Sequence, residues 1–190
     1  MPMYYLPCVN VFPDLIHQCH ANYEPTQRAV MSPSGTFLFY ITPESINEML
    51  HFKPTGPLTP LSLGFVLDQG AKLPSLEITR IGKLFMKPNY QPQEPPPYLD
   101  TWFNEAGKFI IDTFILGFKT SEYVDETILV LLSIFSPRQP LAVRYDYVIF
   151  IADKIHEKFM SMDRERVFKY TSYIYRLLLY YQPDSFQVPL

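Results

Sequence analysis

The chain has 190 residues, a formal net charge of −3 and an apolar fraction of 47%, with 18% charged residues. This length suits one domain, or one domain with a smaller lobe, and the composition is typical of a globular chain. The small negative charge excludes a general electrostatic attraction to nucleic acid or to an anionic membrane, although a local basic face is compatible with it.

Residues 1–35 are predicted to be a poorly regular arm, with a single helical turn after Pro13. This arm contains four residues of the types that bind zinc, which are Cys8, His17, Cys19 and His20. Their spacing matches no common zinc finger or knuckle, and the adjacent Cys19 and His20 would be strained as ligands of one tetrahedral ion. We therefore predict no metal site here.

Residues 1–87 as a whole are predicted to form an irregular N-terminal lobe with one short strand and three short helices. Residues 36–42, TFLFYIT, are aromatic and β-branched between a glycine and a proline, which is typical of a strand. Helix starts follow at Thr42, Thr59 and Pro74, where threonine or serine lies beside proline.

Residues 88–97 are predicted to be a proline-rich spacer between two domains. The stretch KPNYQPQEPPP, from Lys87 to Pro97, has five prolines among eleven residues. Such a sequence favours polyproline geometry and acts as a semi-rigid spacer. The alternative is that it serves as a ligand for a proline-binding groove of another protein.

Residues 98–182 are predicted to form a lobe of four antiparallel helices, followed by a tail at 183–190. The apolar residues recur at a helical period, and capping and proline residues place the helices near 100–118, 122–135, 141–160 and 163–181. Isolated helices of this size are marginal in water, so burial between them must stabilise the lobe. The predicted fold class is mainly α, with an irregular arm preceding a four-helix bundle-like lobe.

His156-Glu157, on the third of these helices, begins the zinc-binding pattern H-E-x-x-H, in which two histidines one turn apart hold the metal. The second histidine would be residue 160, which is Met160. A structural role for His156 is therefore favoured. Since no nucleophile motif and no phosphate-binding loop accompanies it, we predict no catalytic, cofactor-binding or metal-binding residues.

The segment from Lys154 to Arg176 has six Lys and Arg against three acidic residues, interleaved with aromatic rings. Basic groups combined with stacking rings are typical of single-stranded nucleic-acid binding. The candidate partner or nucleic-acid surface consists of Lys158, Arg164, Arg166, Lys169, Tyr170, Tyr173 and Arg176. The favoured alternative is an amphipathic helix whose rings face the other helices and whose charges face water.

Two cysteines are too few for a disulfide framework, and no secretory signal precedes them. Reduced thiols in an intracellular compartment, cytoplasmic or nuclear, are the resulting expectation. The longest apolar runs, 109–118 and 127–136, are about half as long as a membrane-spanning helix. We therefore expect core helices and no membrane association.

Three stretches together resemble a known group of proteins. They are SPSGTFLFYITPESINEML at 32–50, RYDYVIFIADKIHEKF at 144–159 and VFKYTSYIYRLLLYY at 167–181. In this order they are similar to plant transposon and retroelement proteins of the gag-like, uncharacterised type. The resemblance implies a mobile-element-derived, mostly helical, intracellular protein, and it carries no catalytic residue onto this chain.

The leading functional hypothesis is a non-enzymatic interaction or assembly module that is gag-like and associates with itself or with a protein partner. The first alternative is a nucleic-acid-binding protein that uses the Lys154–Arg176 face. The second alternative is an enzyme with a site between the two lobes, where clefts commonly lie.

Overall fold

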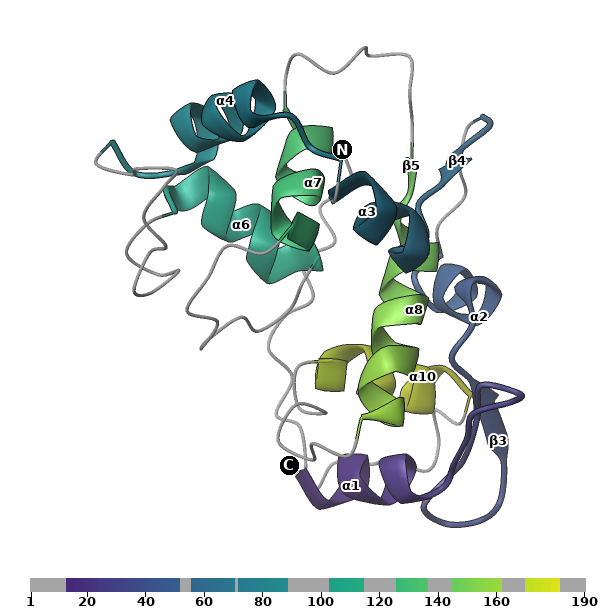
Figure 1. The fold of residues 1–190 in the computed structure, drawn as a ribbon. Helices are drawn as coiled ribbons and strands as arrows, with labels where there is room; N and C mark the ends of the chain where they lie inside the picture. Colours follow the sequence, from purple (N-terminus) through teal and green to yellow (C-terminus); the bar gives the residue numbers. More distant parts are fainter. Residues whose placement is uncertain are drawn as a thin grey trace. The chain divides into compact units, whose positions relative to one another are not determined.

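The computed structural model describes residues 13–51, 56–70, 72–88, 103–114, 126–136, 145–161 and 170–181. In this part of the chain the protein is mainly helical, with eight helices and a small antiparallel sheet (Figure 1). The chain divides into two compact units. One consists of Met1–Pro57 together with Asp146–Leu190, and the other of Leu58–Tyr145.

This division differs from the predicted one at residues 88–97, which fall inside the second unit and lie mostly outside the described residues. On either side of that segment, Met86 and Phe103 form an isolated β-bridge. The backbone N–H of Asn104 also donates to the carbonyl oxygen of Phe85 at 2.9 Å. The chain therefore returns to its starting point after the proline-rich stretch, and this return keeps both sides in one unit.

The helices of the first unit are α1 (Pro13–Ala21), α2 (Pro43–Met49), α8 (Tyr147–Met160) and α10 (Thr171–Tyr181). The predicted helix start at Thr42 is confirmed. The Thr42 side chain accepts a hydrogen bond from the backbone N–H of Ser45, and the Ser45 side chain accepts one from the backbone N–H of Thr42. This reciprocal capping box satisfies two backbone donors that the helix cannot satisfy itself.

A three-stranded antiparallel sheet completes the first unit, with β1 (Tyr23–Glu24), β2 (Ala29–Met31) and β3 (Leu38–Tyr40) in that order. The strand predicted at 36–42 is thus confirmed over Leu38–Tyr40. The prediction of an irregular arm is wrong for the described residues from Pro13 onward, because these form α1, β1 and β2. The register places Val30 opposite Phe39, and both side chains are buried.

The core of the first unit is built from aliphatic side chains and rings of all these elements. Helix α2 packs against α8 and α10, and α1 packs against α10. Burying one large apolar side chain contributes about 1.5–3 kcal/mol. The members of this core include Ile16, Val30, Phe39, Ile46, Phe150, Ile155, Tyr173 and Leu177.

The second unit contains β4 (Thr59–Pro60), α3 (Leu63–Gly70), α4 (Ser75–Phe85), α6 (Glu105–Phe114) and α7 (Glu126–Ile134). Helix α7 packs against α3, α4 and α6. Its residues from Ile128 to Leu132 are all buried. A helix that is covered on several sides needs apolar residues around most of its circumference, which explains the uninterrupted ILVLL sequence.

The second predicted helix start is misplaced. Thr59 and Pro60 form strand β4, and α3 begins at Leu63. The side chain of Ser62 accepts a hydrogen bond from the backbone N–H of Phe65 at 3.1 Å and so caps this helix. The third predicted start, at Pro74, is confirmed by α4.

The four helices predicted for 98–182 are present in the described residues as α6, α7, α8 and α10. The predicted four-helix lobe is not confirmed: α6 and α7 fall in the second unit, and α8 and α10 in the first. Strand β5 (Tyr145–Asp146) precedes α8, and Asp146 caps that helix by accepting from the N–H of Val148 at 3.1 Å. None of the described helices has the length and apolarity that crossing a membrane requires.

Candidate functional site

The predicted basic and aromatic surface is only partly within the described residues. Arg164, Arg166 and Lys169 lie outside them. Lys158 on α8 and Arg176 on α10 are half-buried. Of the five charges in this set, the described residues thus include only these two.

The rings of that set are buried, which corrects the prediction that they form a partner or nucleic-acid surface. Tyr170 and Tyr173 are each 1% exposed. Together with Ile174, Leu177 and Leu178 they recur at helical spacing and form the face of the last helical segment that packs into the first unit. Burial raises the pKa of the Tyr170 phenol, and the nearby Glu157 carboxylate adds to this effect. Rings in this position cannot stack on bases.

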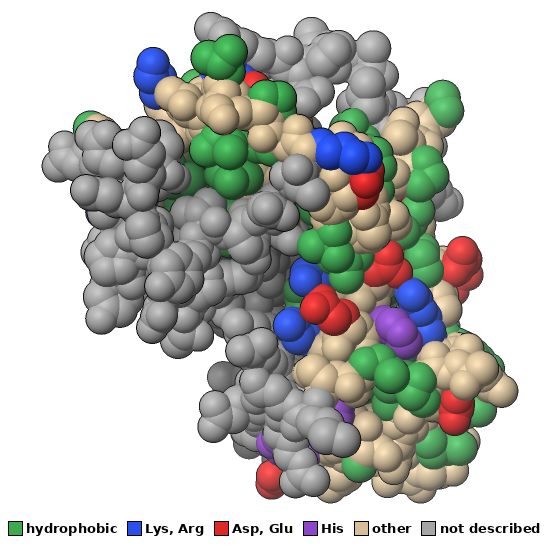
Figure 2. Space-filling view, in the orientation of Figure 1, with side chains coloured by type: hydrophobic (Ala, Val, Ile, Leu, Met, Phe, Trp, Pro, Cys, Tyr) green, Lys and Arg blue, Asp and Glu red, His purple; other side chains and the backbone are tan. Residues whose placement is uncertain are grey.

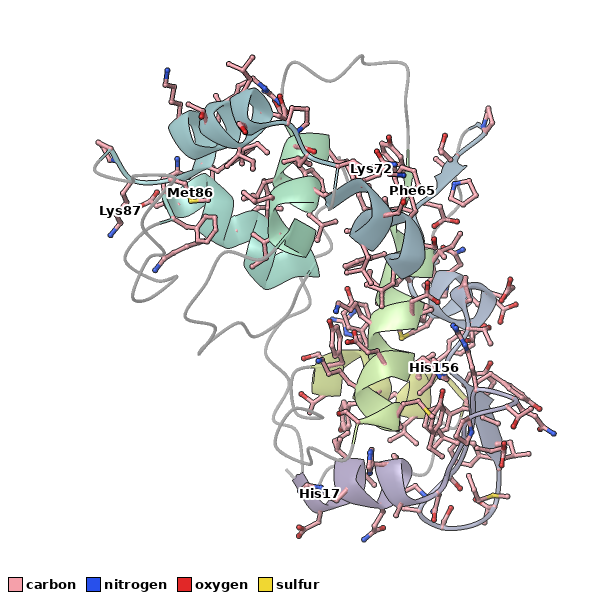
Figure 3. The ribbon with its side chains drawn as sticks, in the orientation of Figure 1. His17, Phe65, Lys72, Met86, Lys87 and His156 are labelled. Carbon is pink, nitrogen blue, oxygen red and sulfur yellow. The ribbon has the colours of Figure 1, made fainter. Side chains whose placement is uncertain are left out.

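A polar cluster instead joins β1 and the following turn to α8. The Tyr23 hydroxyl is hydrogen-bonded to Nδ1 of His156, which lies on α8 (Figure 3). One turn earlier on the same helix, Asp153 Oδ1 accepts from both Nη1 and Nη2 of Arg28, each at 3.1 Å. A neutral hydrogen bond, Tyr23–His156, and an ion pair, Arg28–Asp153, thus connect the β1–β2 hairpin to the same helix.

The pKa shifts in this cluster determine where its protons lie. Burial raises the pKa of the Tyr23 phenol to about 12, so the hydroxyl keeps its proton at neutral pH. Burial, and then the Arg28 guanidinium, lower the pKa of His156, whereas Asp153 opposes them. The lowered pKa favours the neutral form of His156, in which Nδ1 can accept the Tyr23 proton when the ring's own proton is on Nε2.

This protonation pattern favours a structural role for the cluster. A histidine that acts as general base needs a free ring nitrogen, and Nδ1 of His156 is already engaged by the Tyr23 hydroxyl. Asp153 is engaged by Arg28. Within the described part of the chain, no group of three or more His, Cys, Asp or Glu is arranged to hold a metal ion. The cluster therefore fits a tie between the hairpin and α8.

The zinc candidates in the N-terminal arm are only partly within the described residues. Cys8 lies outside the described residues. Cys19 is buried in α1, and burial raises the pKa of its thiol to about 12. Because metals and electrophiles react with the thiolate, a protonated and buried thiol is a poor ligand and a poor nucleophile. The nearby His20 packs its ring against Phe159, with centroids 5.5 Å apart.

An apolar surface that the sequence did not predict lies on the sheet. Met31, Leu38 and Tyr40 are 37%, 43% and 39% exposed, respectively. Met31 lies opposite Leu38 in the register, and Tyr40 follows two residues later, so all three side chains share one face. This set is called the outer sheet face. The run FLFYI at 37–41 contains the only local signal, since it is apolar at both alternating positions.

Comparison with known proteins adds no relative: no family model, curated protein or solved structure matches the chain. The resemblance to plant retroelement proteins therefore rests on the three quoted stretches alone.

Proposed function

We propose that the chain is a non-enzymatic interaction module that associates with a second copy of itself through the outer sheet face. The observation that carries this proposal is the exposure of Met31, Leu38 and Tyr40 on one face of the sheet, whose other face is buried. The small Ala29, opposite Tyr40 on the exposed face, is itself covered. An antiparallel sheet with one solvated face ordinarily alternates apolar and polar residues. Adjacent apolar side chains on the solvated face are typical of a docking surface.

The backbone of β3 supports the same proposal. Ile41 N–H donates to the Arg28 carbonyl at 2.8 Å, and Ser32 N–H donates to the Phe37 carbonyl at 2.9 Å. In an antiparallel ladder, hydrogen-bonded residue pairs alternate with pairs that are not hydrogen-bonded. The residues of the second kind direct their backbone N–H and C=O groups away from the partner strand. The backbone groups of Leu38 therefore face the edge of the sheet that β2 does not cover, next to the exposed side chains. Those of Tyr40 face the same edge, where the Tyr40 carbonyl accepts from the Ser45 hydroxyl. Exposed strand edges are common sites of protein association.

The two alternatives have less support. An enzyme needs converging polar groups that are available to bind substrate. In this cluster the polar groups bind one another, Tyr23 with His156 and Arg28 with Asp153. Nucleic-acid binding needs accessible rings and a surface of one charge sign. Tyr170 and Tyr173 are buried, and basic and acidic side chains are intermingled on the face visible in Figure 2.

The test is sedimentation velocity over a range of concentrations, with the wild-type chain and two variants. Leu38→Lys places a charge on the outer sheet face, and we expect association to weaken by about tenfold or more, equivalent to about 1.4 kcal/mol. Leu76→Lys is the matched control, because Leu76 is 85% exposed on α4, which belongs to the second unit. It should associate as the wild type does.

A wild-type chain that remains a monomer at every concentration would contradict the proposal. Equal weakening of association by Leu38→Lys and Leu76→Lys would also contradict it, because the effect would then be one of charge alone. Single-stranded nucleic acid bound in a salt-dependent manner by a monomer would favour the alternative function instead.

A further inference from the structure

The polar cluster on α8 has a property that is independent of the outer sheet face. We propose that the Tyr23–His156 hydrogen bond and the Arg28–Asp153 ion pair form an acid-sensitive latch, which holds the Tyr23–Met31 hairpin on α8 and loosens when His156 is protonated. The hairpin comprises β1, the turn and β2, and both latch partners on the helix lie within one turn of each other.

The turn places Arg28 for this contact by an unusual backbone conformation. Arg28 has φ +50°, in the left-handed region that residues other than glycine seldom adopt. Its N–H donates to the Pro25 carbonyl at 3.3 Å, and its carbonyl accepts from Ile41 N–H at 2.8 Å. The guanidinium of Arg28 also donates to Asp153, so its backbone N–H, its carbonyl and its side chain are all engaged. Such a conformation persists where the surrounding contacts determine it, which indicates a docked turn.

The apolar part of the contact does not depend on pH. The Tyr23 ring meets Phe159 edge to face, with centroids 4.8 Å apart, and the His156 ring lies 5.9 Å from the Tyr23 ring. Protonation of His156 would leave the Tyr23–Phe159 contact in place. We therefore expect acid to loosen the hairpin locally and not to unfold the unit.

Protonation acts on the polar part of the latch in two ways. Nδ1 of the imidazolium carries a proton and can only donate to the Tyr23 oxygen. The hydrogen bond must therefore reverse its direction, and the Tyr23 hydroxyl has to find another acceptor for its own proton from a half-buried position. A second positive charge also appears next to Arg28, which already opposes protonation. Asp153 favours protonation, but it is shared with Arg28. Charged or titratable groups on α8 and on the elements in contact with it include the following: Asp14, His17, Cys19, His20, Tyr23, Glu24, Arg28, Glu44, Glu48, Tyr147, Asp153, Lys154, Glu157, Lys158 and Tyr170.

The direction of the pH effect follows from the lowered pKa of His156. The folded chain binds this proton less tightly than the unfolded chain, whose histidine has its ordinary pKa of 6.5. The stabilisation is therefore fully present above pH 6.5, and it is lost as the pH falls from 6.5 through the lower pKa of the folded state. The latch is closed at neutral pH and opens in mild acid.

The test is hydrogen exchange of the hairpin amides, including Arg28 and Met31, whose N–H groups donate to Pro25 and Asn22. Protection factors, corrected for the intrinsic exchange rate, should fall by about three- to tenfold in the wild type between about pH 7.5 and about pH 5. His156→Asn should lose this dependence, because the asparagine oxygen can accept the Tyr23 proton near the position of Nδ1 but does not titrate.

Two further variants separate the latch from other effects. His51→Asn removes an exposed histidine of the same unit, and asparagine tolerates the φ of +52° found there, so its pH dependence should equal that of the wild type. Tyr23→Phe keeps the ring on Phe159 and should lower protection already at neutral pH. Leu38→Lys should keep the latch even if association is lost, so the two proposals can fail separately.

Three results would overturn the latch. Wild-type protection that is unchanged across this pH range would do so. The same loss of protection in His156→Asn as in the wild type would also do so. The third is a His156 pKa, measured by NMR titration of the histidine ring, at or above 6.5.

Discussion

Helix α10 and the β2–β3 hairpin both combine aromatic and branched apolar residues, yet they present them in opposite ways. In α10, Tyr173 and Leu177 are buried in the core of the first unit, whereas Leu38 and Tyr40 of β3 are exposed. A helix can gather its apolar residues on one side by spacing them three and four apart, while a strand divides consecutive residues between two faces. An aromatic-rich segment therefore indicates a partner surface only when its secondary structure leaves one apolar face uncovered.

The largest effect should come from the buried rings. Tyr173→Ala removes a ring that is 1% exposed, and we expect a loss of about 3–5 kcal/mol in the free energy of unfolding, as for other buried aromatic residues. Tyr180→Ala, at the 42% exposed neighbour on the same helix, should cost less than about 1 kcal/mol. Urea denaturation measures both. If Tyr173→Ala does not fold, Tyr173→Phe should still cost more than Tyr180→Phe. Equal costs would contradict the burial of this face.

A glycine pair tests the same contrast between crowded and open positions in the second unit. A Cβ at Gly107 would lie 2.6 Å from the Phe85 carbonyl oxygen and 2.9 Å from a Phe103 ring carbon. Gly107→Ala should therefore destabilise the chain by about 1–3 kcal/mol. Gly64 on α3 has nothing within 4 Å of such a Cβ, so Gly64→Ala should stabilise the chain by about 0.5–1 kcal/mol. Thermal unfolding checks both predictions, because the unfolding temperature should fall for Gly107→Ala and rise for Gly64→Ala. Stabilisation by Gly107→Ala would contradict the close approach of α4 and α6.

The helix start that connects β3 to α2 should have an intermediate effect. Thr42→Ala removes the side chain that caps the N–H of Ser45, and we expect a loss of about 1 kcal/mol. Thr42→Ser keeps the capping oxygen and should recover most of that loss. Urea denaturation of the two variants distinguishes the cap from the methyl group, and an equal cost for both would show that the cap does not contribute.

The smallest effect on folding should come from the outer sheet face. Leu38→Lys should change the free energy of unfolding of the monomer by less than about 0.5 kcal/mol, because the side chain is already exposed. Urea denaturation at a concentration below association provides the measurement. A loss of 2 kcal/mol or more, on the order of a core substitution, would place Leu38 in the core and remove the contrast with Tyr173.

The sequence predicted the features that local chemistry determines. Thr42 beside a proline specified the start of α2, and FLFYI specified β3. Strands β1 and β2, only two and three residues long, were missed because pairing with other parts of the chain defines them. The joining of both chain ends in one unit was missed for the same reason.

In the candidate site, too, contacts between distant parts of the sequence could not be predicted. The structural interpretation of His156 followed from Met160, which takes the place of a second histidine. Its partner Tyr23 is 133 residues away in the sequence, and no local pattern could pair them. The predicted surface was wrong for Tyr170 and Tyr173 because their helical spacing fits a core face as well as a stacking face. Only the packing of α10 decides between the two.

Hydroxyl-radical footprinting of the tyrosines, read by mass spectrometry, tests the central contrast most directly. We expect Tyr40 and Tyr180 to be oxidised in the dilute native chain, and Tyr170 and Tyr173 to be protected until the chain unfolds. At higher concentrations Tyr40 should become protected while Tyr180 stays reactive. Oxidation of Tyr173 at the rate of Tyr180 in the native chain would contradict the account, because the rings assigned to the scaffold would then be the accessible ones.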